Sequence, residues 1–205
     1  MRLGLFCGLL LLCMACTAQA QSQRLLVLGD SISAAYGMSL EQGWVALLQT
    51  TLAEQEEDVN VINASISGET TGGGLRRLPA LLEEHQPTLV LIELGGNDGL
   101  RGYPLGRLQG NLLDMVTLAQ AAGAEVILVP MEIPPNYGSR YTAGFRDSFI
   151  SVADQTNIHL APFILDGVAT EPKLMQADGI HPTASAQPLL LENVLPTIEA
   201  VLAQQ

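Results

Sequence analysis

The stretch Leu25-Leu26-Val27-Leu28-Gly29-Asp30-Ser31 joins a short, continuously apolar run to a glycine and two polar residues. An apolar run of this length without alternation is typical of a parallel strand that is covered on both faces. Helices provide that cover, and functional side chains gather in the loops at the carboxyl ends of the strands. The stretch therefore predicts an α/β sheet whose first strand ends just before Gly29 and is followed directly by Ser31.

Four further apolar runs alternate with segments of helical periodicity. The expected strands are Leu25 to Leu28, Val59 to Ile62, Leu89 to Leu94, Val126 to Val129 and Ile158 to Leu160. The expected helices are Trp44 to Glu57, Leu75 to Glu84, Leu105 to Ala122, Phe145 to Gln155 and Ala184 to Leu202. This alternation predicts right-handed crossovers and a three-layer αβα sandwich around a parallel sheet. Pro196 is expected to bend or interrupt the last helix.

Residues 1–20 have the pattern of a secretory signal peptide. Arg2 precedes an apolar stretch that is shorter than the roughly 20 residues of a membrane-spanning helix, and Ala18-Gln19-Ala20 resembles a cleavage site. We expect residues 21–205 to form one mature domain, periplasmic or secreted, without a stable membrane anchor. All three cysteines lie in the segment to be removed, so the mature protein would have no thiol. Lipidation of Cys16 is the less favoured alternative.

The charge of the chain argues against nucleic acid as a partner. The formal net charge of the 205 residues is -12, and removal of Arg2 with the signal changes it to -13. Such a surface repels phosphate backbones and anionic lipid headgroups. We therefore expect neither nucleic-acid binding nor electrostatic docking to a membrane, while the oligomeric state stays open.

Three residues could form a nucleophilic site: Ser31, Asp178 and His181. His181 would act as the general base for the Ser31 hydroxyl, and Asp178, three residues earlier, would orient the imidazole. Asp30 is a weaker candidate for the orienting role because side chains of neighbouring residues diverge, so we expect it to cap a helix or brace the loop. A metal-dependent hydrolase with Asp178, His181 and Asp30 as ligands is an alternative.

Acyl transfer also needs hydrogen-bond donors for the oxyanion. The backbone N–H groups of Ser31 and Gly68 and the side-chain amide of Asn97 are the candidates, and the absence of a side chain at Gly68 would allow close approach. The spacing alone leaves it open whether Asn97, which follows two glycines, is a donor or a turn former. The loop Pro130 to Gly138 could line a pocket or merely connect two elements.

Four sequence blocks together resemble those of the SGNH (GDSL) hydrolase family, and the resemblance extends from about Arg24 to the end of the chain. The blocks are Gly29 to Gly37, Ser67 to Thr70, Gly95 to Gly99 and Asp178 to Pro182. The chain looks most like the bacterial secreted branch that includes thioesterases, lysophospholipases and arylesterases. The resemblance implies Ser31, Asp178 and His181 as catalytic residues and Ser31, Gly68 and Asn97 as oxyanion donors. Ile32 stands where the GDSL pattern has Leu.

The family resemblance further implies a flavodoxin-like five-stranded sheet in the order 2-1-3-4-5 and no metal or cofactor. It also implies a groove for the acyl or aryl group, formed by Tyr103, Leu105, Ile133, Pro134 and Tyr137. The expected activity is hydrolysis of aryl, short-to-medium acyl and lysophospholipid esters, and of thioesters, through an acyl-serine intermediate. Two alternatives share the scaffold: an acyltransferase, and a non-catalytic protein that binds lipids or glycans.

Overall fold

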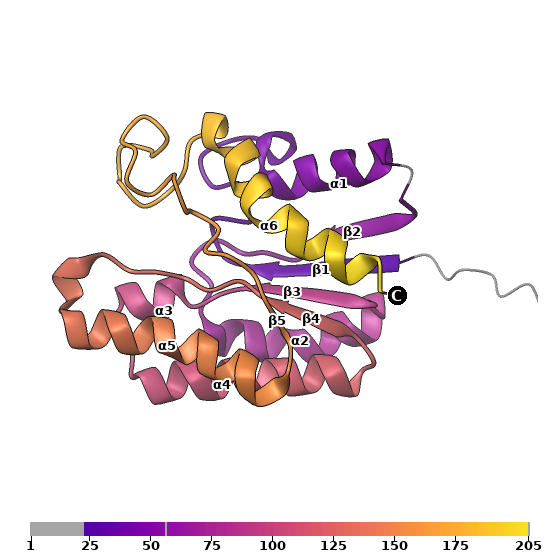
Figure 1. The fold of residues 1–205 in the computed structure, drawn as a ribbon, viewed down its shortest axis with the longest axis horizontal. Helices are drawn as coiled ribbons and strands as arrows, with labels where there is room; N and C mark the ends of the chain where they lie inside the picture. Colours follow the sequence, from indigo (N-terminus) through magenta and orange to yellow (C-terminus); the bar gives the residue numbers. More distant parts are fainter. Residues whose placement is uncertain (1–22, 56, 205) are drawn as a thin grey trace, which may run out of the picture.

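A five-stranded parallel sheet forms the centre of the molecule, in the order β2-β1-β3-β4-β5 (Figure 1). The computed structural model describes residues 23–55 and 57–204, so the predicted signal peptide lies outside the described residues. The strands are β1 Gln23–Gly29, β2 Val59–Asn63, β3 Leu89–Glu93, β4 Glu125–Leu128 and β5 His159–Leu160. The predicted sheet order is confirmed, and it places β1, which leads to Ser31, between β2 and β3.

Helices cover both faces of the sheet, with α1 and α6 on one face and α2, α4 and α5 on the other (Figure 1). Their bounds are α1 Trp44–Glu54, α2 Thr71–His85, α3 Gly96–Leu100, α4 Leu105–Ala121, α5 Ser139–Thr156 and α6 Gln187–Leu202. Short 3-10 turns lie at Leu40–Gln42, Pro135–Tyr137 and Ala184–Ala186. The predicted αβα sandwich is therefore confirmed.

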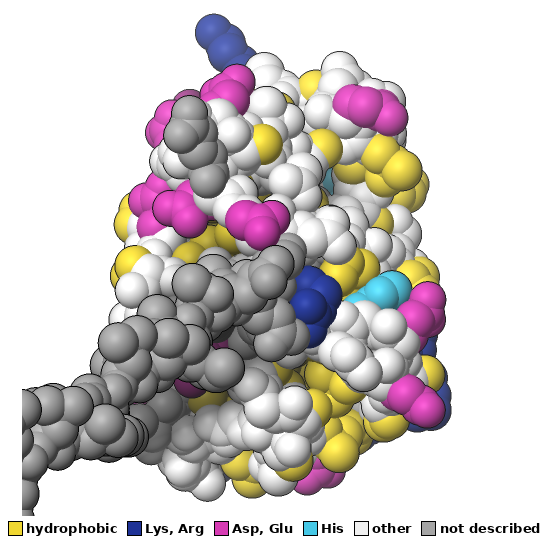
Figure 2. Space-filling view, turned by 90° about the vertical axis from the view of Figure 1, so that its right-hand side faces the viewer, with side chains coloured by type: hydrophobic (Ala, Val, Ile, Leu, Met, Phe, Trp, Pro, Cys, Tyr) yellow, Lys and Arg dark blue, Asp and Glu magenta, His cyan; other side chains and the backbone are white. Residues whose placement is uncertain are grey.

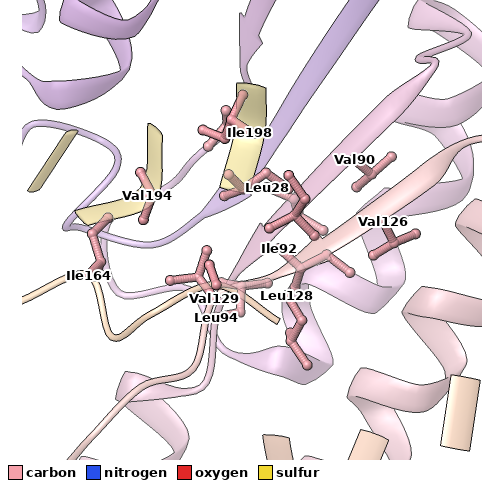
Figure 3. Close-up of a cluster of buried hydrophobic side chains, with 14 of the residues drawn as sticks. Leu28, Val90, Ile92, Leu94, Val126, Leu128, Val129, Ile164, Val194 and Ile198 are labelled. Atoms are coloured by element: carbon pink, nitrogen blue, oxygen red, sulfur yellow. The ribbon is translucent and has the colours of Figure 1, made fainter. Parts of the chain in front are cut away.

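The core lies between the sheet and its helices. Leu28, Ile92 and Leu128 are partners in register on three adjacent strands, and all are inaccessible to solvent. Figure 3 shows these side chains together with Val194 and Ile198 of α6. Complete burial of such a side chain contributes about 1.5–3 kcal/mol relative to leaving it exposed. The apolar composition of the strands thus holds their carboxyl ends at fixed relative positions.

Several elements begin or end at other residues than predicted, because tertiary contacts stabilise helical turns that lie outside the apolar pattern. Helix α2 begins at Thr71 rather than Leu75, although it then includes three glycines. The Asp98 carboxylate accepts hydrogen bonds from the Thr71 N–H and hydroxyl, and the Thr70 hydroxyl caps the same helix end, which compensates for the glycines. Helix α5 begins at Ser139, before the predicted Phe145, and α6 continues through Pro196 without interruption.

The loops at the carboxyl ends of the strands lie on the left of Figure 1, where the segment between β5 and α6 projects beyond the sheet. Figure 2 views the opposite end of the molecule, where acidic side chains lie singly or in small groups. None of the helices in the described part of the chain is both long enough and apolar enough to cross a membrane.

Candidate active site

Ser31 lies in a tight turn at the end of β1, and Gly29 makes this turn possible. A Cβ atom at position 29 would lie 2.7 Å from both Glu93 Oε2 and Ser33 Oγ, so only glycine fits without displacing them. The sequence Gly29-Asp30-Ser31 suggests a strand that passes directly into a helix, but turns follow Ser31 and α1 begins only at Trp44. Ser31 is thus held by contacts of its turn with β3 rather than by a helix.

The predicted Ser31, His181 and Asp178 form a continuous hydrogen-bonded series. His181 Nε2 lies 2.9 Å from Ser31 Oγ, and His181 Nδ1 lies 2.7 Å from Asp178 Oδ2. Asp178 Oδ1 also accepts the backbone N–H groups of Ile180 and His181, which closes the loop into a fixed turn. Residues 150 positions apart in the sequence are therefore brought together by the folded sheet and its loops.

The charge state of Asp178 determines the direction of these hydrogen bonds. The hydrogen bond from the His181 ring, followed by those from the two backbone N–H groups, lowers the pKa of Asp178 to about 2. An ionised carboxylate only accepts hydrogen bonds, so Nδ1 of a neutral His181 carries the proton. Nε2 is then the acceptor for the Ser31 O–H group. This is the proton arrangement that a general base needs before it activates a hydroxyl.

Two residues that the sequence analysis did not single out hold His181 in place. The Tyr36 ring lies against the His181 ring, with centroids 4.2 Å apart and an interplanar angle of 34°. The Gln176 side-chain amide donates to the carbonyl groups of Tyr36 and Pro182, which ties the two loops together. Their functional position depends on contacts between distant segments and has no local sequence signal.

The two predicted oxyanion-donor residues beyond Ser31 lie on a loop, Gly68, and on the short helix α3, Asn97, and these two segments are connected. Gly68 has φ +78°, in the left-handed region that favours glycine, and its carbonyl accepts a hydrogen bond from Arg101 Nη2 at 3.2 Å. Arg101 also donates its backbone N–H to the Asn97 carbonyl at the end of α3. Arg101 therefore connects the loop of Gly68 with the helix of Asn97.

Asn97 belongs to the short helix α3, and its side chain makes a specific tertiary contact. Its Nδ2 donates to Asp30 Oδ2 at 3.0 Å, while Asp30 Oδ1 accepts the Ile32 N–H. This contact gives the Asn97 side chain a tertiary partner, which a residue that only forms a turn would not need. Asp30 braces the loop, as one of its two predicted roles states, but it caps no helix. Burial, the largest effect, raises the pKa of Asp30 to about 6.

An apolar cavity of about 690 Å³ opens beside these residues, within the size range of small-molecule sites. Ser31, Asn97 and His181 line it, and its apolar wall includes Leu100, Met131, Ile133, Pro134, Phe163, Leu165, Met175 and Ile180. The cavity lies between the loop after β4 and the segment between β5 and α6. The loop Pro130 to Gly138 thus contributes to a pocket rather than serving only as a connection.

Only part of the predicted groove lines this cavity. Ile133 and Pro134 do, whereas Tyr103, Leu105 and Tyr137 do not. The Tyr137 hydroxyl donates to the Leu100 carbonyl, and Leu105 lines a separate hollow with Tyr137. The Tyr103 ring lies beneath the Arg107 guanidinium. The contacts of these three side chains thus lie outside the cavity, a placement that the sequence alone does not distinguish from substrate contact.

The ligand set of the metal-dependent alternative is not assembled. Across residues 23–55 and 57–204, no group of three or more His, Cys, Asp or Glu side chains is placed to hold a metal ion. Asp30 instead accepts hydrogen bonds from Ile32 and Asn97, while Asp178 contacts His181.

Comparisons with known proteins agree with this geometry. The model of the GDSL-like Lipase/Acylhydrolase family matches residues 27–187. The chain is 56% identical over 186 residues to esterase TesA of Pseudomonas aeruginosa, covering 91% of this chain and 92% of the relative. It is 44% identical over 173 residues to thioesterase 1/protease 1/lysophospholipase L1 of Escherichia coli, covering 84% and 82%.

A solved structure is similar in fold as well as sequence. The psychrotrophic esterase EstA from Pseudoalteromonas sp., inhibited by monoethylphosphonate, has a TM-score of 0.86 and 49% identity. The match covers 88% of this chain and 99% of that structure. The family match includes the loops of Ser31, Gly68, Asn97 and His181. The chain therefore belongs to the GDSL-like lipase/acylhydrolase family, the SGNH hydrolases, and is an esterase of that family.

Proposed function

We propose that this esterase cleaves its substrates through an acyl intermediate on Ser31. The observation that carries the proposal is the series of hydrogen bonds from Ser31 through His181 to Asp178, of 2.9 and 2.7 Å. As the Ser31 Oγ forms a bond to the acyl carbon, His181 takes the hydroxyl proton and then transfers it to the leaving oxygen or sulfur. Water, activated by the same base, releases the acid. Asp178 stabilises the imidazolium in both steps.

The oxyanion of each tetrahedral intermediate would be bound by the backbone N–H groups of Ser31 and Gly68 and by the Asn97 side-chain amide. Asn97 is oriented by its hydrogen bond to Asp30, and the loop that carries the Gly68 N–H is held by the hydrogen bond from Arg101 to the Gly68 carbonyl. Donors that are fixed before the reaction stabilise developing charge without reorganisation. This arrangement supports catalysis on esters and thioesters alike, because both pass through the same kind of intermediate.

The substrates would be lipid-like or aryl esters with a short-to-medium acyl chain, including lysophospholipids. The apolar wall of the 690 Å³ cavity supports this class, as do the names of the esterase and thioesterase/lysophospholipase relatives. Cleavage of the signal after Ala20 would release residues 21–205, in one domain, into the periplasm or medium. In that compartment, exogenous esters and lysophospholipids are more accessible than cytosolic acyl-CoA. The acidic surface argues against nucleic acid as a partner.

Covalent labelling tests the nucleophile. We expect a fluorophosphonate to react with one equivalent of enzyme and to abolish ester hydrolysis, with mass spectrometry of the digested protein placing the phosphonyl group on Ser31. Unfolded enzyme serves as the control, because its serine lacks the His181 base and should not react. A label on another residue, with activity lost in parallel, would contradict the assignment.

Replacement of Asn97 by alanine tests the oxyanion site. We expect Asn97→Ala to lower kcat by about 10²- to 10³-fold, because one preorganised donor is removed, with a much smaller change in KM. Steady-state kinetics with p-nitrophenyl butyrate measures both constants. Asn136→Ala, at an exposed position in the loop after β4, is the matched control and should retain kcat. Equal kcat in the two variants would refute the role of Asn97.

A further inference from the structure

Glu93 is a buried acid directly beneath the turn of Ser31. It is the last residue of β3, lies in register with Gly29 of β1, and has no solvent-exposed surface. Its Oε2 accepts the Ser33 hydroxyl at 2.7 Å and the Asp30 N–H at 3.2 Å. The Ser33 oxygen in turn accepts the Trp44 indole N–H. One oxygen of Glu93 thus holds both ends of the turn that contains Ser31.

The second oxygen of Glu93 is in a different situation. Oε1 is buried and has no hydrogen-bond partner among the described residues. A buried carboxylate with an unsatisfied oxygen is costly, whereas a protonated carboxyl group loses much of that penalty. Both donors to Glu93 bind the same oxygen, Oε2, and the carbonyl oxygen of an uncharged carboxyl group can accept them.

Asp30, the neighbouring acid, uses its carboxylate differently. Its Oδ1 accepts the Ile32 N–H and its Oδ2 accepts the Asn97 amide, so both oxygens are acceptors. Two donors thus face the Asp30 carboxylate, while Ser33 and Trp44, which contact Glu93 or its partner, are uncharged. The geometry favours the negative charge on Asp30.

The pKa of Glu93 leads to the same distribution of charge as the hydrogen bonds do. Burial, followed by the charge of Asp30, raises the pKa of Glu93 well above its ordinary value. Two adjacent buried carboxyl groups do not both ionise readily, because the second charge is desolvated and repelled by the first. Glu93 therefore keeps its proton when Asp30 has lost its own.

We propose that Glu93 is a positioning residue of the esterase site that acts as an uncharged acid: it fixes the turn of Ser31 and leaves Asp30 to orient Asn97 as the anion. This inference rests on the proposed roles of Ser31 and Asn97. In the sequence, this role of Glu93 is marked only by the presence of one glutamate at the end of the apolar strand Leu89 to Glu93. Glu93 itself does not contact the cavity, so its effect passes through Asp30 and the turn.

Two isosteric amide substitutions distinguish the roles of the acids. Glu93→Gln keeps one oxygen for the two donors and places its NH₂ group at the unpartnered position, so we expect kcat within about threefold of the native enzyme. Asp30→Asn places an NH₂ group opposite one of the two donors that Asp30 accepts, the Asn97 amide or the Ile32 N–H, and so misplaces Asn97. We therefore expect kcat to fall by about 10- to 100-fold with little change in KM. Glu93→Ala, which removes the acceptor, should also lower kcat. Steady-state kinetics with p-nitrophenyl butyrate provides these values.

Stability as a function of pH gives an independent readout. The folded-state pKa of Glu93 is raised, so its stabilising contribution is complete below the unfolded-state value of about 4.5 and decreases as the pH rises towards the folded-state value. Glu93→Gln lacks this titration. Its urea midpoint should therefore increase relative to the native enzyme between pH 4.5 and 7, whereas Glu125→Gln, at an exposed position on β4, should show no such trend.

Either of two results would overturn the inference: loss of kcat in Glu93→Gln as large as in Asp30→Asn, or a difference in midpoint that does not increase with pH. Both would show that Glu93 works as an anion or only fills space. Failure of the proposed function is recognised separately, because Ser31→Ala would then retain activity.

Discussion

Ser31→Ala is expected to lower kcat for p-nitrophenyl ester hydrolysis by about 10⁴- to 10⁶-fold, while the protein keeps its fold. The hydroxyl is the only group in the proposed mechanism that forms a bond to the acyl carbon, and no neighbouring side chain replaces it. Residual turnover would come from direct attack of water on the ester, with the oxyanion donors stabilising the charge that develops on the carbonyl oxygen. Initial rates over a range of ester concentrations measure the loss, and circular dichroism with thermal unfolding establishes that the fold is retained.

The matched control for this variant is Ser67→Ala. Ser67 is an exposed serine on the neighbouring loop, next to Gly68, and it is not part of the hydrogen-bonded series. It should retain kcat within about twofold. If Ser31→Ala kept a substantial part of the native rate, the acyl-Ser31 mechanism would be wrong, even though the family membership would stand.

His181→Ala has the second large expected effect, a loss in kcat of about 10⁴- to 10⁶-fold. Without the imidazole, Ser31 Oγ loses its acceptor at 2.9 Å, and no group takes the proton during attack or returns it to the leaving group. The double variant with Ser31→Ala should be no slower than either single variant, because the two residues act as one unit. Single and double variants are compared by initial rates with the same ester.

His85→Ala is the control for the histidine. His85 ends α2 near Arg24 at the start of β1, at the opposite end of the strands from these loops, so its removal should leave kcat within about twofold. Additive losses in the Ser31/His181 double variant would show that the two side chains act independently, which contradicts a serine activated by His181.

Much of the fold could be predicted because its signals are local. The run Leu25 to Leu28 is apolar at every position, as burial on both faces of a sheet requires, and it is inaccessible to solvent in the structure. The predicted start of α5 was wrong by six residues because Ser139 to Gly144 lack a continuous apolar pattern. Pro196 remains within α6, where packing against the sheet outweighs its local cost.

The site residues also divide into those that local sequence signals predict and those that they do not. Ser31, Asp178 and His181 carry recognisable chemistry at recognisable spacing, and the structure brings them within hydrogen-bond distance. Tyr36, Gln176 and Glu93 could not be predicted from the sequence, because their residue types are common and their contacts join distant segments. Tyr103, Leu105 and Tyr137 show the converse, because they lie near the active edge and yet make their contacts outside the cavity.

The sequence by itself determined the alternation of strands and helices, the glycine at position 29 and the chemical identity of the serine, histidine and aspartate groups, because these depend on residue type and near-neighbour spacing. The tertiary structure alone decided which apolar residues form the cavity and which acid beneath Ser31 holds the charge. The physical reason is that burial, hydrogen-bond partners and the field of a neighbouring carboxylate depend on segments far apart in the chain, such as Glu93 against Gly29 and Asp30 against Asn97.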